Sequence, residues 1–261
     1  MPTSRPTPSP SADAPRPAAR RAPSPALQPV HNAIVACERC PRLRGHCTRV
    51  ATEKRAAFRS DLYWGRPVPG FGDPLARMLV IGLAPAAHGA NRTGRVFTGD
   101  GPGGSGDFLM RALHAHGFAN QPISRGPDDG LALADAYIAA AVRCAPPENR
   151  PTREEFARCQ PHLEEEWRAL PRVRVVVCLG QLAFDVCWRV LAARGVVRPA
   201  PRPRFAHGAC IRVAGGPVVL AGYHPSRQNT NTGRLTAAMM AAVFGQARRV
   251  LDARQENASP D

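Results

Sequence analysis

The chain has 261 residues, enough for one domain with a sizeable core, and a formal net charge of +15. Nearly all of the positive charge is arginine, whose guanidinium suits bidentate contacts with phosphate, so we expect a polyanionic partner unless the arginines are simply scattered. The sequence contains neither an apolar run of about 18 residues nor a secretory signal, which excludes a membrane-spanning helix and favours a cytoplasmic protein whose cysteines are thiols or metal ligands.

The two ends of the chain are predicted to be disordered. Residues 1–28 are rich in Pro, Ala, Ser and Arg, and such a segment buries too little apolar surface to offset the entropy that ordering costs. Residues 255–261 are expected to fray as well. Between them, residues 29–254 are predicted to form a single folded domain.

Strands and helices alternate along this domain. Four apolar runs predict strands buried on both faces, at Met78–Gly82, Ala136–Val142, Val173–Leu179 and Val218–Gly222. Apolar residues at helical spacing predict helices around residues 108–113 and 183–191 and a closing helix over 236–253. Such alternation predicts an α/β fold, with a parallel four-stranded sheet that carries helices on both faces.

Two polar loops follow the first and the last of these strands. The first, GLAPAAHGANRTGRVFTGD at residues 82–100, contains glycines and arginines with Phe97 as its one phenyl ring. The second is YHPSRQNTNTGRLT at residues 223–236. Because ligands of such folds sit beyond the carboxyl ends of the strands, the two loops are expected to face one another across one cleft.

Four cysteines suggest a metal site. Cys37 and Cys40 form a CxxC, while Cys144 and Cys159 bracket a proline-rich insert after the second strand. Four thiolates suit zinc or an iron–sulfur cluster, and the spacing does not decide between the two. Cys47 is an alternative that would replace one of the four ligands.

The insert is predicted to contain a short helix. Thr152 and Glu155 form a capping box at its start, and Pro161 is expected to interrupt it soon after Cys159. The remaining cysteines lie in apolar patterns and are interpreted as buried small hydrophobes. They are Cys178, Cys187 and Cys210.

Taken together, GLAPA with Phe97 downstream, the HPS loop ending in TGRLT and the four cysteines resemble the type 5 uracil-DNA glycosylases, over roughly residues 30–250. The resemblance implies a three-layer α/β/α sandwich with a central, mostly parallel four-stranded sheet. It also implies a [4Fe–4S] cluster bound by Cys37, Cys40, Cys144 and Cys159. The implied reaction is hydrolysis of the N-glycosidic bond of uracil in DNA, which leaves an abasic site for base excision repair.

The resemblance is incomplete at two positions. Ala84 stands where many relatives have Asp, so general-base help is expected to be weak or to come from elsewhere. Ala140 stands where relatives often have a base-reading Asn, which is compatible with further deaminated bases such as hypoxanthine or xanthine. The expected partner is DNA that contains deaminated bases, and the protein is expected to be a monomer near the bacterial nucleoid.

The flipped-out base requires a flat apolar partner and hydrogen bonds to its edge. Phe97 is expected to stack on it, and the backbones of Gly82, Leu83 and Ala84 are expected to meet its polar edge. His224 is expected to donate a hydrogen bond to the base carbonyl oxygen that gains charge in the transition state.

Water activation is assigned to the first loop. Asn91 is the candidate that orients the attacking water, and Asp100 is a possible base. Asp107 is a further carboxylate nearby, although helix capping explains both aspartates equally well. Six polar residues of the two loops are predicted to contact DNA. They are Arg92, Arg95, Ser226, Arg227, Asn229 and Arg234.

One different function fits the charge and the cysteines. A non-catalytic module that carries a metal cluster and binds DNA for regulation would explain both features. It would not explain why two polar loops follow the carboxyl ends of two strands.

Overall fold

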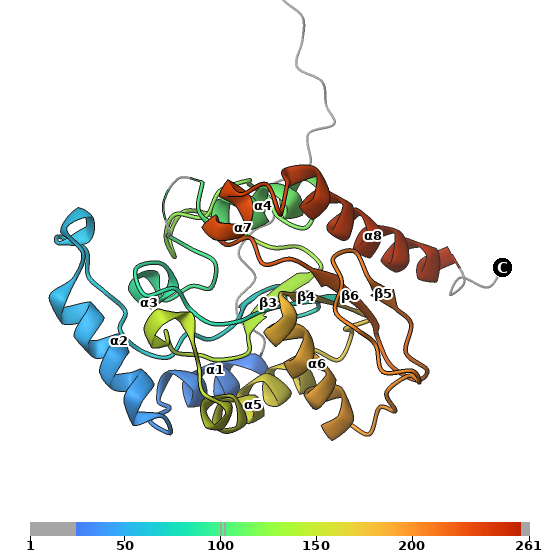
Figure 1. Ribbon diagram of the computed structural model, residues 1–261, viewed down its shortest axis with the longest axis horizontal. Coiled ribbons are helices and arrows are strands. Elements are labelled where there is room, and N and C mark those ends of the chain that lie inside the picture. Colours follow the sequence, from blue (N-terminus) through green and yellow to red (C-terminus); the bar gives the residue numbers. More distant parts are fainter. Residues whose placement is uncertain (1–24, 100, 102, 257–261) are drawn as a thin grey trace, which may run out of the picture.

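The computed structural model describes residues 25–99, 101 and 103–256 (Figure 1). Most of the predicted tail, residues 1–24, lies outside the described residues, and so do 257–261. Folded chain begins earlier than predicted, because helix α1 (Leu27–Val35) starts inside the expected tail and Leu27 is buried. A second helix that the sequence pattern did not reveal, α2 (Pro41–Glu53), follows the CxxC.

A six-stranded sheet forms the middle layer, in the order β1-β3-β2-β4-β6-β5. Its centre consists of the four predicted strands, which run parallel and are buried at every position. They are β2 (Met78–Gly82), β3 (Ala136–Ala140), β4 (Val175–Leu179) and β6 (Val218–Gly222).

The predicted count of four strands is corrected by two short antiparallel edge strands. β1 (Phe71–Gly72) pairs with β3, and β5 (Cys210–Ile211) pairs with β6. Two residues are too few to show the alternation by which a strand is recognised in sequence. Cys210 lies on this exposed edge, so its prediction as a buried thiol is wrong, whereas Cys178 and Cys187 are fully buried.

Helices cover both faces of the sheet, which confirms the three-layer prediction (Figure 1). One face packs against α4 (Ser105–Ala115) and α8 (Ala237–Glu256). The other packs against α5 (Arg153–Arg168) and α6 (Gln181–Ala193), with α1 lying on α5. Successive strand residues point to opposite faces, so each strand supplies both cores. Short helical turns occupy the loops: η1 (Ala56–Phe58), α3 (Ala90–Thr93), η2 (Pro147–Asn149) and α7 (Arg227–Asn231).

Helix α5 differs from its prediction at one end. The capping box of Thr152 and Glu155 is present at its start. The helix does not stop near Pro161, however, but continues to Arg168. Proline removes one backbone hydrogen bond, yet the buried side chains on both sides of it, among them Phe156 and Leu163, hold the helix against the core.

Candidate active site

A cavity lies at the carboxyl end of the parallel strands, where the two polar loops meet. Gly82 and Ala140 line it from the ends of β2 and β3, and His224 lines it from just beyond β6. The first loop and the start of α4 supply the other lining residues. They are Ala84, Pro85, Ala86, Gly89, Ala90, Val96, Phe97, Thr98 and Ser105.

Phe97 and His224 lie side by side in this cavity. Their ring centroids are 5.7 Å apart and the ring planes are tilted by 31°. Phe97 adopts a φ of +49°, a left-handed conformation that costs a non-glycine residue about 1–3 kcal/mol and that is concentrated at functional sites. A Cβ at Gly82 would come within 2.8 Å of the Phe97 ring, so the ring rests directly on the glycine backbone.

The backbone carbonyl of His224 is held by hydrogen bonds, and the residue lines the cavity. Its carbonyl accepts hydrogen bonds from Asn229 Nδ2 and from the Ser226 amide, both at 2.8 Å. Burial lowers the pKa of His224 to about 4, so the ring is neutral at pH 7. A neutral imidazole still carries one N–H donor and one acceptor nitrogen. His224 can therefore donate a hydrogen bond without carrying charge.

Ser226 and Asn229 thus position the second loop. The Ser226 hydroxyl caps α7 by accepting from the Asn229 amide at 3.3 Å. Arg227 and Arg234 are exposed on the same loop, and the Arg234 guanidinium lies 4.8 Å from the Tyr223 ring centroid. Contact of these two arginines with DNA stays a prediction.

Leu83 does not line the cavity, although it was predicted to meet the base. Its carbonyl accepts from the Val142 amide, and the Gly82 carbonyl accepts from the Ala141 amide, both at 2.9 Å. These bonds extend the pairing of β2 with β3 beyond the strands. Gly82 and Ala84 are the residues of this predicted set that line the cavity.

Asn91 does not reach the cavity either. It is fully buried, and its amide nitrogen donates to the carbonyls of Cys47 and Ala87 at 3.4 and 3.3 Å. This placement gives no support to the prediction that Asn91 orients water. Asp100 lies outside the described residues.

Asp107 fits its structural interpretation. It is buried at the start of α4, accepts from the amides of Gly103 and Ser124, and forms an ion pair with Arg125 at 3.6 Å. Its neighbour in that first turn, Ser105, lines the cavity and was missed. The sequence signal was present, because a serine in a glycine-rich run ahead of an apolar helical pattern is typical of a helix start.

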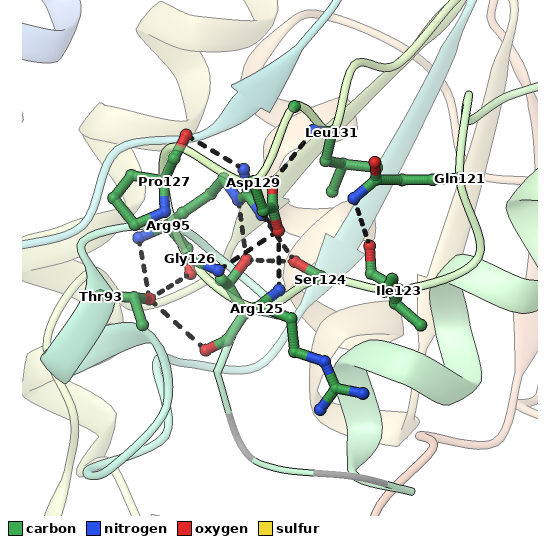
Figure 2. A network of polar contacts seen from close by, with 12 residues as sticks. Thr93, Arg95, Gln121, Ile123, Ser124, Arg125, Gly126, Pro127, Asp129 and Leu131 are labelled. Carbon is green, nitrogen blue, oxygen red and sulfur yellow. Dashed lines mark hydrogen bonds and ion pairs between the residues drawn. The ribbon is translucent and has the colours of Figure 1, made fainter.

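Arg95 is engaged inside the protein instead of facing DNA. Its side chain is 5% exposed and donates to Thr98 Oγ1 at 2.9 Å, Ser124 Oγ at 3.0 Å and Asp129 at 2.6 Å (Figure 2). Burial acts to raise the pKa of Asp129, but hydrogen bonds from Arg95 and from backbone amides lower it to about 2. This placement gives no support to the predicted phosphate contact of Arg95, which instead fastens the cavity loop (residues 82–99) to residues 124–129.

Arg92 is likewise paired inside the protein. It forms an ion pair with Asp61, and its guanidinium lies 4.0 Å from the Phe58 ring centroid. Its partners lie some thirty residues away in sequence, and a pattern within one loop does not reveal them. The predicted phosphate contact gains no support from this placement.

The predicted ligand cysteines lie just before α2 (Cys37 and Cys40), after β3 (Cys144) and in α5 (Cys159). The Arg143 amide donates to Cys159 Sγ at 3.2 Å. Burial raises the pKa of the Cys159 thiol to about 11, although the charge of Arg143 acts in the opposite direction. The sulfurs of Cys37 and Cys40 also raise this pKa. A hydrogen bond to Cys47, followed by burial and by the charges of Cys47 and Cys159, raises the pKa of Cys144.

Cys40, Cys144 and Cys159 are buried, Cys37 is half-buried, and one of these sulfurs accepts a backbone N–H. Thiolates of cysteine are the usual ligands of iron–sulfur clusters. Within the described ranges, no group of three or more His, Cys, Asp or Glu side chains is arranged so that it could hold a metal ion. Cys47 Sγ lies 3.7 Å from the Ala145 carbonyl and also contacts Cys144.

No helix in the described part of the chain has the length and apolar character needed to cross a membrane.

Comparison with known proteins gives a consistent result. The model of the uracil DNA glycosylase superfamily matches residues 69–248. The type-5 uracil-DNA glycosylase of Thermus thermophilus is 50% identical over 217 residues, which cover 83% of this chain and 94% of the relative. That of Mycobacterium leprae is 48% identical over 83% of this chain and 92% of the relative. The type-4 enzyme of Pyrobaculum aerophilum is 28% identical over 77% and 83%.

Proposed function

Because this chain belongs to the type-5 uracil-DNA glycosylases of the uracil DNA glycosylase superfamily, we propose that it hydrolyses the N-glycosidic bond of uracil in DNA and leaves an abasic site. One observation carries the proposal. Phe97 and His224, from loops far apart in sequence, lie 5.7 Å apart in one cavity at the carboxyl edge of the sheet.

The base is stacked and polarised in this cavity. It leaves the duplex, because its glycosidic bond is unreachable inside the stack, and packs against the Phe97 ring. As the bond breaks, negative charge grows on the base and positive charge on the sugar. The neutral imidazole of His224 donates to the base oxygen that gains charge. A donor already in place requires no reorganisation when the bond breaks, which is why such donors are effective.

The described part of the cavity offers no strong general base to the attacking water. No carboxylate is among the described lining residues, and Ala84 contributes only a methyl group. Asp100 follows directly after the cavity loop in sequence and remains our candidate base. Stabilisation of the leaving base is therefore the larger contribution to the rate.

The range of accepted bases follows from β3. Ala140 lines the cavity beside Gly82 and offers no side-chain hydrogen bond to a base edge. A site that does not hydrogen-bond a particular substituent discriminates weakly against bases that lack it. We therefore propose that hypoxanthine and xanthine are removed as well as uracil.

We further propose that Cys37, Cys40, Cys144 and Cys159 bind a [4Fe–4S] cluster. When bound, the cluster supplies a structural crosslink between the CxxC segment and the insert after β3. The same junction is supported by Arg42, which donates to both carboxylate oxygens of Glu155 at 2.8 and 2.7 Å.

Visible absorbance and iron and sulfide analysis of the purified protein test the cluster. Cys144→Ser should remove the colour and lower the thermal midpoint, while Cys47→Ser should keep the colour. A colourless wild-type protein that contains zinc would contradict the proposal. If instead Cys47→Ser bleaches the protein, Cys47 is a ligand.

The activity is tested with labelled oligonucleotides that carry uracil, hypoxanthine, xanthine or thymine, followed by alkaline cleavage at abasic sites. We expect cleavage of the first three and none of the thymine control. Tight binding to all four without cleavage would instead support the non-catalytic DNA-binding alternative.

A further inference from the structure

A compact arm of chain, residues 54–62, lies beside α3 at one edge of the molecule (Figure 1). It begins where α2 ends, at Lys54, which has a φ of +52°. Lys54 Nζ donates to the Arg59 carbonyl at 3.3 Å and so ties the start of the arm to its middle. The single turn of η1 lies between these two residues.

Arg92 fastens the arm to the cavity loop. Its guanidinium pairs with Asp61 and covers the Phe58 ring on the arm, and the same side chain donates to the carbonyls of His88 and Gly99. The Arg92 side chain thus bridges the arm and the loop whose residues line the cavity. The arm is therefore held at a fixed place relative to the base pocket.

The arm presents a basic and apolar surface to solvent. Arg55 and Arg59 are exposed, and neither guanidinium has a hydrogen-bond or ion-pair partner within the described part of the chain. Leu62 is 94% exposed. Burial, followed by the charges of Arg55 and Arg92, lowers the pKa of His88, so the positive field of the arm reaches the cavity loop.

The arginines of the cavity loop itself are already paired. Arg92 and Arg95 neutralise Asp61 and Asp129, and Arg95 is buried. DNA that delivers a base to the cavity carries about one negative charge per 1.7 Å of duplex. Within the described part of the chain, the guanidinium groups of Arg55 and Arg59 on the adjacent arm are exposed and unpaired, and they are available to such a duplex.

We infer that the arm is a second DNA-contact element, in which Arg55 and Arg59 bind phosphates that flank the everted nucleotide and Leu62 contacts the neighbouring sugars. The inference rests on the proposed function, since DNA at the cavity is its premise. Phosphate contacts of this kind position the duplex without reading its sequence.

The inference is tested by fluorescence anisotropy with full-length protein and a duplex that contains no uracil, at several salt concentrations. Arg55→Ala combined with Arg59→Ala should weaken binding about tenfold and reduce the salt dependence of log Kd by about 1.8, since each phosphate contact contributes about 0.9. Leu62→Ala should weaken binding with an unchanged salt dependence. Circular dichroism confirms that the variants fold.

Arg172→Ala combined with Arg174→Ala is the matched control, because these exposed arginines precede β4 at the amino end of the parallel strands, whereas the cavity lies at their carboxyl end. It should bind as wild type does. An arm variant with wild-type affinity and salt dependence would overturn the inference, even if wild type releases uracil. A wild-type protein that releases no base, while the arm variant still loses affinity, would overturn the proposed function and leave the arm standing.

Discussion

The cavity and the thiol region differ in what their buried titratable groups contact. The imidazole of His224 has no hydrogen-bond partner among the described residues, and Phe97 is held in a strained conformation. Beside the thiols, Glu166 is fully buried, pairs with Arg143 at 2.6 Å and accepts from Tyr137 Oη at 3.1 Å and from the Gly70 amide at 2.7 Å.

This difference separates the chemistry from the support. Groups with spare hydrogen-bonding capacity face the cavity, where a substrate can use it. Beside the thiols, the buried charges of Arg143 and Glu166 are paired with each other and hold segments together. Changes in the thiol region are therefore expected to alter stability, and changes in the cavity are expected to alter turnover.

Glu166→Ala should have the largest effect. It leaves the fully buried Arg143 guanidinium without its carboxylate, and breaking a buried pair in this way costs about 3–5 kcal/mol. Denaturant unfolding measures the loss. Glu165→Ala, which removes an exposed ion pair with Arg168 on the same helix, should leave stability almost unchanged. Equal losses in the two variants would show that burial of the Glu166–Arg143 pair does not make it important for stability.

His224→Ala should show the opposite behaviour. The turnover rate should fall by about 10²–10³, the loss typical of a single oxyanion donor, with little change in stability or DNA affinity. Single-turnover kinetics and anisotropy measure the two effects separately. A variant that loses only DNA affinity would show that His224 binds the duplex and takes no part in bond cleavage.

Gly82→Ala should lower uracil release by less than His224→Ala does, and it tests the position of the Phe97 ring. The new methyl group would lie 2.8 Å from the Phe97 ring, so the ring must shift and part of the stacking energy, about 1–3 kcal/mol per base, is lost. Gly222→Ala is the control at the equivalent end of β6, where the methyl group would meet Leu179 at an ordinary 3.6 Å. If both variants keep wild-type uracil release, the ring does not support the base.

The smallest expected effect is that of pH on the rate contribution of His224 near neutrality. The pKa of His224 is about 4, below its ordinary 6.5, so the folded protein keeps the ring neutral until the pH approaches 4. The rate ratio of wild type to His224→Ala should stay constant down to about pH 5 and change only below that pH, where the imidazole gains its second proton. The unfolded chain takes up this proton below about pH 6.5, so stability declines as pH falls from there toward 4. A rate ratio that already changes between pH 7 and 6 would show that the pKa of His224 is that of an ordinary imidazole.

The sequence predicted well what depends on local pattern. Met78–Gly82 and Val218–Gly222 agree residue by residue with β2 and β6, because a strand buried on both faces reads as a continuous apolar run. Phe97 and His224 were placed together by one topological rule about the carboxyl ends of strands. Their strain and their lowered pKa were not predictable, since both depend on packing.

What the sequence missed depends on distant partners. Arg95 has the pattern of an exposed loop arginine, and only Asp129, brought close by the fold, makes it internal. Asn91 is buried against α2, where its side-chain amide donates to the Cys47 carbonyl. The sequence of α2 is too polar to show a helical pattern, so this contact was not predicted. Pro161 was expected to end a helix that long-range packing preserves.

A crystal structure of the His224→Ala variant with a duplex that contains uracil would locate the base itself. We expect the uracil outside the helix stack, lying on the Phe97 ring with its edge toward Gly82 and Ala140. A base that remains paired in the duplex, or that occupies another surface while this cavity stays empty, would contradict the assignment of the cavity as the base pocket.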